Sequence, residues 1–462
     1  MSARPDHPPQ PLEPVDESLP SRRIKGALDE FRLALSAVPA LRRRAAGVML
    51  SASAQAAIQL LGLATGLVVV RLLPVREYAY YTIANAVLGT MSVLSDSGIA
   101  DSLIAQGGKV WRDRRALGGL LAAGLALRKR FALIAAAISL PIMYVLLTRQ
   151  GATPAVAALV AASVVPLYAG TLTGQLLQIV PRLHQQSVQL QRIQVAAAVL
   201  RFALVTGVAK LLPLAWIASL CAGAAQTWSN WRLRRLAAGL ADLDAAPDRE
   251  AWQKCIRQVR RSAPSAVYYA FEGQIAVLLV SMFGRTSGVA SVGALTRLAM
   301  IFQVVAAVFA LLWVPRFAKL SYDRRVLGAF WGAQLALIGV SLIPVVCVAL
   351  FPQAILRVLG PEYRSLGHEA LIAALGGAFG LLGGCSYWMS AARGVVISPW
   401  LMIPLALGAQ IVLISVLPLS TVAGVLWLGA FTNLAYWIMH TLNFTRAQLP
   451  RRTAEAAASG QP

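Results

Sequence analysis

The sequence predicts an all-α integral membrane protein with about 12 transmembrane helices. Hydrophobic residues make up 58% of the 462 residues and charged residues only 13%, and the mean hydropathy is +0.65. Apolar stretches long enough to cross about 30 Å of hydrocarbon recur along the chain, and the first of them, 45–70, contains no charge. No alternating pattern typical of a barrel occurs, so each span is expected to be a helix, which satisfies its own backbone hydrogen bonds.

The apolar stretches form two groups of six, separated by the longest polar break in the chain. We expect an N-terminal six-helix bundle over 47–231, a cytoplasmic linker over 232–262 and a C-terminal six-helix bundle over 263–444. Each half begins after a pair of arginines, so the two bundles are expected to be parallel repeats related by a pseudo-two-fold axis along the membrane normal. The expected spans are 47–70, 79–100, 131–148, 154–174, 193–212, 214–231, 263–283, 291–314, 328–351, 368–391, 398–417 and 421–444.

Both ends of the chain are expected to lie outside the membrane. Residues 1–46 are polar and proline-rich, which predicts a cytoplasmic, partly disordered tail with a short surface helix over 28–41. No apolar h-region precedes the first span, so no cleavable signal peptide is expected. Residues 445–462 are expected to form a cytoplasmic C-terminal tail.

The positive charge predicts the topology. The 42 Lys and Arg residues give a net charge of +23, which in a soluble protein would suggest a nucleic-acid partner. Here 33 of the 42 fall on the predicted cytoplasmic side, seven on the outer side, and two, Arg201 and Arg297, inside spans. This asymmetry is typical of the positive-inside rule, so we expect both termini in the cytoplasm and no nucleic-acid partner.

Three ionisable side chains inside the expected spans are candidates for function, because such groups are costly in hydrocarbon. Glu272 lies about nine residues into the seventh span, roughly 14 Å deep at 1.5 Å per residue. Arg201 lies in the fifth span and Arg297 in the eighth. One hypothesis is that the arginines hold an anionic group and Glu272 is a proton site, a sodium site or a counter-ion. The alternative is a structural pair, such as Arg297 with Glu272, that fixes helix packing.

Polar residues at helical spacing extend this candidate set. Tyr268 precedes Glu272 by one turn, and Gln55 and Gln59 repeat that spacing on the first span, so these side chains either line a substrate cavity or join helices. Asp96, near the end of the second span, is a second candidate for ion coupling or for a counter-ion. Arg71 and the run Arg128-Lys129-Arg130 are expected to extend to lipid headgroups at the membrane interface.

No catalytic or metal site is expected. The four cysteines lie far apart, and neither they nor the four histidines show a metal-binding or redox spacing. No nucleophile–base arrangement occurs either. The sequence therefore favours a transporter over an enzyme, with no cofactor, coupled to a proton gradient, a sodium gradient or the membrane potential.

Four short motifs carry a family resemblance. The run Arg71-Leu-Leu-Pro-Val-Arg-Glu-Tyr78-Ala-Tyr80-Tyr81 is similar to "R-L-G-P-x-E-Y-G-x-Y", and Leu94-Ser-Asp96-Ser-Gly98-Ile99-Ala-Asp-Ser-Leu103 to "D-x-G-[LI]-x-x-A-L". Val292-Gly293-Ala-Leu-Thr-Arg297-Leu with Val314-Pro315-Arg316 is similar to "V-G-x-Y-x-x-A-x-R-L … P-x-L", and Gly360-Pro361-Glu362-Tyr363 to "G-x-x-Y". In this order, the motifs resemble those of the polysaccharide biosynthesis (O-antigen-type) flippases of the multidrug/oligosaccharidyl-lipid/polysaccharide exporter superfamily.

The resemblance covers about 45–445 and implies a monomeric, V-shaped pair of bundles in a bacterial cytoplasmic (inner) membrane. It implies export of undecaprenyl-diphosphate-linked oligosaccharide from the inner to the outer leaflet, for O-antigen, capsule or exopolysaccharide. The implied partners are this polyprenyl diphosphate, membrane lipids, and the polymerase and export machinery of the same pathway. Ala79 and Ala294 depart from the Gly and Tyr of the family patterns.

Three other classes of membrane protein are alternatives to this one. A polymerase or ligase needs a large outer loop, and the longest here is about 351–367. A major-facilitator transporter needs a glycine-spaced basic loop after the second span, which 109–115 lacks. A cation-coupled multidrug exporter of the related toxin-extrusion family shares the implied fold and stays open as the alternative.

Overall fold

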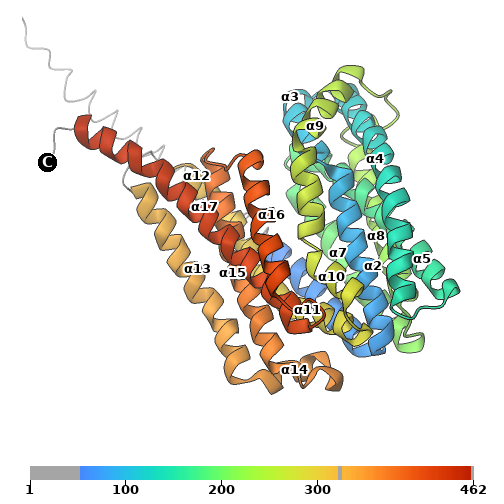
Figure 1. Ribbon diagram of the computed structural model, residues 1–462. Coiled ribbons are helices and arrows are strands. Elements are labelled where there is room, and N and C mark those ends of the chain that lie inside the picture. The colour runs from blue at the N-terminus through green and yellow to red at the C-terminus, as the bar shows by residue number, and fades with distance from the viewer. Residues whose placement is uncertain (1–51, 321–324, 459–462) are drawn as a thin grey trace, which may run out of the picture. The chain divides into compact units, whose positions relative to one another are not determined.

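A computed structural model describes residues 52–320 and 325–458 of the chain. The predictions for the tail over 1–46 and for the start of the first span lie outside the described residues. Within the described ranges the protein is all helical, with no strand. This confirms the all-α class (Figure 1).

The N-terminal half consists of eight helices in the described residues. Asp113 caps α4 by accepting hydrogen bonds from the backbone N–H groups of Arg115 and Ala116, and Thr153 caps α5 just before a proline at its first position. The helices are Ala52–Leu72, α2 (Val75–Asp96), α3 (Ile99–Val110), α4 (Arg114–Arg149), α5 (Pro154–Leu177), α6 (Ile179–Leu183), α7 (Ser187–Leu211) and α8 (Ala215–Ala238).

The C-terminal half begins within the stretch expected to be a linker, because α8 continues to Ala238 and the next helix starts at Arg249. Asp248 caps that helix by accepting from the N–H of Glu250. The helices are α9 (Arg249–Glu272), α10 (Ile275–Phe283), α11 (Thr286–Leu312), α12 (Val314–Ala318), α13 (Arg325–Leu350), α14 (Pro352–Leu359), η1 (Pro361–Tyr363), α15 (Gly367–Ala392), α16 (Pro399–Val416) and α17 (Val422–Ala458).

The described helices account for the expected spans in three ways. Nine helices are long and apolar enough to cross a membrane. A tenth span is the pair α9 and α10, bent by 52° at a short break. The remaining two expected spans correspond to α2, with 22 residues, and α8, with 24. These two are long enough to cross but more polar than the other spans, and α2 carries Glu77 and Asp96.

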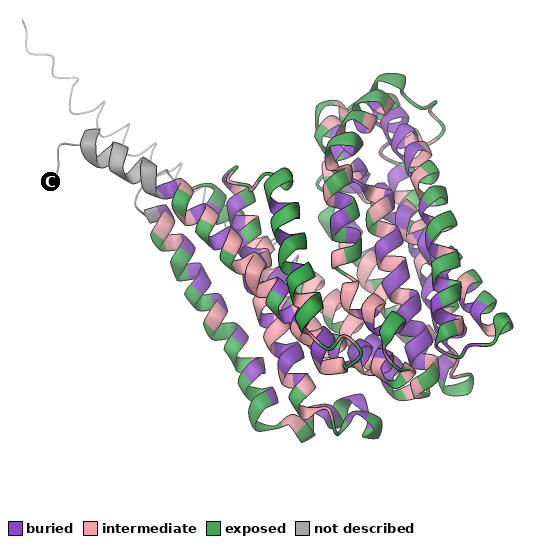
Figure 2. Cartoon of the chain, viewed as in Figure 1, coloured by how far each residue is buried: buried purple, intermediate pink, exposed green. Residues whose placement is uncertain are grey.

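Helix α2 lies inside the N-terminal half and is largely buried (Figure 2). It packs against α4, α5, α8, α9 and α11. Gly293 of α11 lies so close to α2 that a Cβ there would sit 2.3 Å from the Thr82 hydroxyl oxygen. Helix α16, in contrast, buries only Met402, Ala406 and Gln410.

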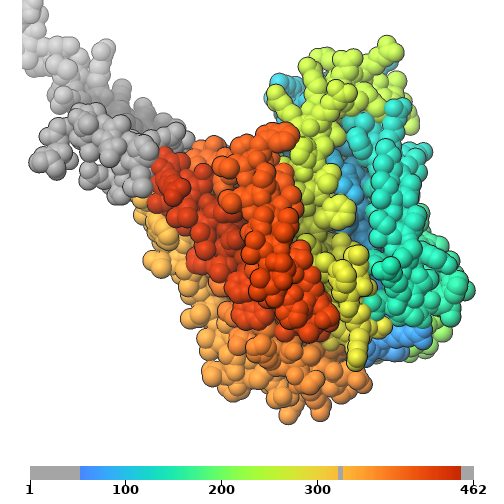
Figure 3. Space-filling model, in the orientation of Figure 1, coloured from blue at the N-terminus to red at the C-terminus, as the bar shows by residue number. Residues whose placement is uncertain are grey.

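Helix α9 packs against helices of both halves. It contacts α2, α3 and α4 on one side and α16 on the other, and Figure 3 shows it in yellow-green between the orange-red α16 and the teal α4. In sequence order α9 belongs to the C-terminal half, but it also packs against the N-terminal half.

Three side chains also join the two halves, at the end of the molecule where α10 and α14 lie (Figure 1). Arg71 donates 2.7 Å hydrogen bonds to two carbonyl groups in the last turn of α14. Gln150 donates to the carbonyls of Ser281 at 2.8 Å and Gly284 at 3.3 Å, and the Thr286 hydroxyl donates to the Gln150 carbonyl at 3.2 Å. We call the contacts of Arg71, Gln150 and Thr286 the polar latch.

Candidate functional site

The N-terminal half contains a polar cavity of about 450 Å³. Three of the predicted substrate residues, Gln55, Gln59 and Arg201, line it together. Helices Ala52–Leu72, α7 and α8 supply most of its wall. Its other polar residues are Thr65, Gln178, Arg182, Gln194, Gln226 and Ser229. We call this space the N-cavity.

Hydrogen bonds between side chains hold part of the N-cavity wall in place. The Gln178 side-chain oxygen accepts from Gln194 at 2.9 Å and from Arg182 at 3.0 Å. Gln226 donates to the Asn230 side-chain oxygen at 3.1 Å. A wall of guanidinium and carboxamide groups presents both donors and acceptors, which suits a hydroxyl-rich or anionic ligand.

The two predicted arginines converge on one tyrosine of α2. Tyr81 is 3% exposed and interacts electrostatically with both Arg201 and Arg297. Arg297 also lies beside Tyr78, and its guanidinium contacts the Met300 sulfur at 3.6 Å. Because Met300 lines the N-cavity, Arg297 lies next to this space, although it does not line it.

The Arg297 side chain extends from α11, in the C-terminal half, to the helix Ala52–Leu72 and contacts it at Gly66. A Cβ at Gly66 would lie 2.9 Å from Cδ of Arg297, so a larger residue at this position would have to displace the Arg297 side chain. The alternative pairing of Arg297 with Glu272 is not formed. Among the described residues the only ion pairs are Asp96 with Arg128 and Glu250 with Lys254.

Glu272 lines a separate cavity of about 300 Å³ in the C-terminal half, which we call the C-cavity. Tyr268, expected in the same cavity as the arginines, instead accepts a hydrogen bond at its hydroxyl from Tyr436, which lines the C-cavity. The wall combines one carboxylate with aromatic rings and small residues of α15, a lining that suits a cation. The lining residues are Tyr269, Glu272, Gly380, Gly383, Gly384, Tyr387, Asn433, Tyr436 and His440.

Glu272 is also the last residue of α9, immediately before the break in the seventh span. Gly273 and Gln274 separate it from the start of α10. A break in a spanning helix frees backbone carbonyl groups, and transporters use such discontinuous helices to bind coupling ions. The carboxylate therefore stands where both side-chain and backbone oxygens are available.

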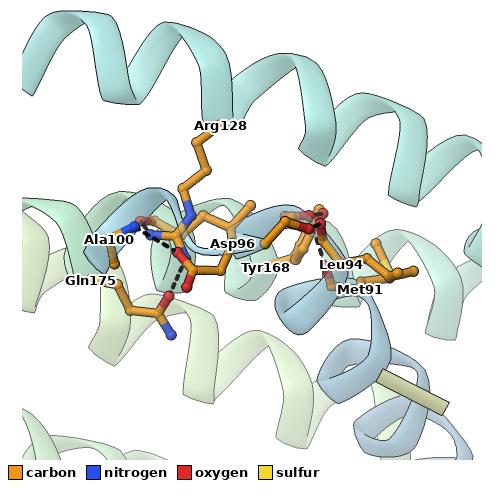
Figure 4. A network of polar contacts seen from close by, with 10 residues as sticks. Met91, Leu94, Asp96, Ala100, Arg128, Tyr168 and Gln175 are labelled. Atoms are coloured by element: carbon orange, nitrogen blue, oxygen red, sulfur yellow. Dashed lines mark hydrogen bonds and ion pairs between the residues drawn. The ribbon is translucent and has the colours of Figure 1, made fainter. Parts of the chain in front are cut away.

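Asp96 lies in neither cavity and forms a buried network in the N-terminal half (Figure 4). Its carboxylate is 3.0 Å from the Arg128 guanidinium. Arg128 also donates to the Leu172 carbonyl at 3.2 Å and to the Gln175 side chain. The expectation that Arg128 reaches lipid headgroups is wrong: its side chain is only 2% exposed, because α4 runs unbroken through this residue and turns it towards α5.

Several residues that line the two cavities were not predicted from the sequence. Arg182 and Gln178 lie at the junction of α5 and α6, which was expected to be a cytoplasmic loop. Asn433 and His440 are seven residues apart on α17, a spacing that brings both to one helix face. This spacing is the sequence feature from which the pair could have been predicted.

The described residues contain no group of histidines, cysteines and carboxylates that could hold a metal ion. The candidate site therefore consists of two cavities, one cationic and rich in carboxamides, the other bearing a carboxylate.

The described helices share their fold with solved transporter structures. The chain is similar to the inward-facing conformation of a multidrug resistance MATE family transporter of the MOP superfamily, with 17% identity and a TM-score of 0.68 over 86% of this chain and 96% of that one. The outward-facing conformation of a multidrug resistance MATE family transporter gives 15% identity and a TM-score of 0.57 over 88% and 96%. The eukaryotic MATE transporter AtDTX14 gives 14% and 0.59 over 87% and 95%. No protein-family model matches the chain, and no curated protein matches it.

These likenesses establish the MATE-type fold. All three solved structures are of MATE transporters, and none of them is of a polysaccharide flippase.

Proposed function

We propose that this chain is a cation-coupled exporter that works by alternating access. The observation that carries the proposal is the MATE-type fold with a carboxylate, Glu272, at a helix break in the C-cavity. In this mechanism a proton or sodium ion binds at Glu272 and its release resets the cycle. The neighbouring tyrosines and His440 exclude bulk water and supply further oxygen or nitrogen ligands.

We propose further that the conformation described here faces the cytoplasm. The polar latch joins the halves through segments that the charge distribution assigns to the outer side. The higher TM-score against an inward-facing transporter supports the same assignment.

For the cargo, a specific observation favours a second candidate beside a multidrug substrate. The N-cavity holds Arg182 and Arg201 among glutamines, with Arg297 adjacent. Arginine recognises phosphate oxygens through paired hydrogen bonds, and carboxamides suit sugar hydroxyls. This chemistry fits a diphosphate-linked oligosaccharide on a polyprenyl carrier, which would require a polymerase and export machinery downstream for surface polysaccharide synthesis.

The coupling proposal is tested in proteoliposomes under an imposed proton or sodium gradient, with release of a fluorescent cationic drug as readout. Glu272→Gln should abolish gradient-driven transport while leaving the protein folded. Glu362→Gln, which removes an exposed carboxylate outside both cavities, is the control and should leave transport unchanged. Full gradient-driven transport by Glu272→Gln refutes the proposed role of this carboxylate.

The cargo is tested in cells that lack the gene. Inward-facing lipid-linked oligosaccharide should accumulate if the flippase assignment holds, and drug susceptibility should rise if the cargo is a drug. Arg201→Gln should reproduce the deletion phenotype, whereas Lys210→Gln, an exposed position on the same helix, should not. Altered drug susceptibility without oligosaccharide accumulation assigns the chain to multidrug export.

A further inference from the structure

An apolar groove of about 560 Å³ lies between α11, α12 and α13, away from both cavities. Its walls are aliphatic, with Val304, Val308 and Leu312 from one side and Ala336 and Val340 from the other. We call it the α11–α13 groove. An engineered apolar cavity of about 150 Å³ holds a benzene molecule, so this groove has room for a considerably longer hydrocarbon.

The length of the groove matches one leaflet of a bilayer. Its lining on the first wall extends from Val304 to Arg316 within one continuous span, Thr286–Ala318. Twelve residues at 1.5 Å each give about 18 Å. The hydrocarbon core is about 30 Å thick, so this distance covers slightly more than one leaflet.

Small residues keep the second wall of the groove open. Gly332 lines the groove, and a Cβ at this position would have no heavy atom within 4 Å. Ala336, one turn further along the same helix, is exposed. A larger side chain at Gly332 would therefore fill the groove without displacing its neighbours.

One end of the groove carries a positive charge and an indole ring. Arg316 is exposed there, and within the described residues no carboxylate lies within ion-pair distance of it. Trp313 lines the same end, and tryptophan is typical of the headgroup level of a membrane. Lys319, three residues further along the chain, is also exposed. Exposed basic residues at the headgroup level attract anionic lipids.

We propose that the α11–α13 groove binds one acyl chain of an anionic phospholipid, with the phosphate at Arg316. The charge at the end of the groove selects an anionic headgroup. The single-leaflet length matches an acyl chain better than a long polyprenyl chain, whose greater part would extend beyond the groove. The site does not depend on the exported cargo, because it shares no lining residue with the N-cavity or the C-cavity.

The test is photo-crosslinking of the full chain in phosphatidylcholine vesicles that contain phosphatidylglycerol with a photoreactive acyl chain. Mass spectrometry measures the labelling of peptides covering 304–316 and 332–340. Gly332→Phe should remove most of this labelling. Gly408→Phe, which adds the same side chain at an exposed and open position on α16, should not. Equal labelling of the two variants overturns the proposal.

The charge preference is tested separately with a photoreactive phosphatidylcholine. Wild-type labelling by phosphatidylglycerol should exceed that by phosphatidylcholine, and Arg316→Gln should lower this ratio by about fivefold, the equivalent of about 1 kcal/mol. Lys210→Gln, at an exposed position on α7 far from the groove lining, should leave the ratio unchanged. Equal labelling by the two lipids overturns the proposal, as does labelling by a photoreactive polyprenyl phosphate that phosphatidylglycerol does not displace.

Discussion

Replacing Asp96 by asparagine should destabilise the protein, because it leaves the buried Arg128 guanidinium without its carboxylate. The two groups lie 3.0 Å apart, and the Arg128 side chain is 2% exposed. Removing one partner of a buried ion pair costs about 3–5 kcal/mol, since the other charge stays buried without compensation. The Asp96 side chain is 32% exposed and asparagine retains one acceptor oxygen, so we expect a loss of about 3 kcal/mol.

The reverse change should cost less. After Arg128→Met the carboxylate of Asp96 can still reach water, and the loss is mainly that of hydrogen bonds to the Leu172 carbonyl and Gln175, about 1–2 kcal/mol. In the double variant neither charge is left buried. The loss in the double variant should therefore fall short of the sum of the single losses by about 2 kcal/mol.

The free energy of unfolding can be measured by titrating the purified protein with SDS in mixed micelles and following helix content by circular dichroism. The exposed pair Glu250 and Lys254, whose side chains are 72% and 45% exposed, is the control. Glu250→Gln should change the free energy of unfolding by less than about 0.5 kcal/mol. Additive losses at Asp96 and Arg128, or a loss for Asp96→Asn no larger than that for Glu250→Gln, would refute the reasoning.

Three further changes test the contacts between the halves. Gly293→Val should lower the free energy of unfolding by about 1–3 kcal/mol, because its Cβ would overlap Thr82, whereas Gly429→Val, with open space around it, should not. Gly66→Val should impair export by displacing the Arg297 side chain, while Gly207→Val, which meets no neighbour, should leave export unchanged. Gln150→Ala should raise the rate at which a thiol reagent labels Ser281→Cys by about fivefold, because removing two of the latch hydrogen bonds weakens closure by about 1 kcal/mol; an unchanged rate would contradict this role of the latch.

The helical class and most of the spans could be predicted from the sequence, because uncharged runs of more than 18 residues have few other solutions. The break in the seventh span could not. Gly273 and Gln274 are ordinary residues in an apolar context, and only the packing of α9 against α2, α3 and α4 reveals that α9 and α10 follow different directions. The full length of α4 was also missed, because the triplet Arg128-Lys129-Arg130 interrupts an apolar run that begins at 116. The part of α4 before the triplet packs against α3 and α9.

The candidate site was partly predictable for a related reason. Charge inside an apolar run identifies Arg201, Arg297 and Glu272, but sequence position does not say which of them share a cavity. The structure separates Glu272 from the two arginines. Arg128 was assigned to the membrane surface because it stands in a basic triplet, and a helix turns successive residues by about 100°, so only one of the three faces the interior.

In the proposed cycle the two halves have different roles, because Arg201 and Glu272 lie in different cavities. Arg297 belongs to α11 in the C-terminal half, yet it crosses Gly66 and lies beside Tyr78 and Tyr81 of α2. Any motion that parts α11 from α2 must withdraw this guanidinium from the tyrosines and from the edge of the N-cavity. An anionic cargo held by Arg201 and Arg182 would then lose the additional cation Arg297 as the halves separate on the latch side. In the proposed cycle, release of an anionic cargo is therefore linked to the same helix movement that opens the latch, and Gly66 is the position where that movement can be blocked.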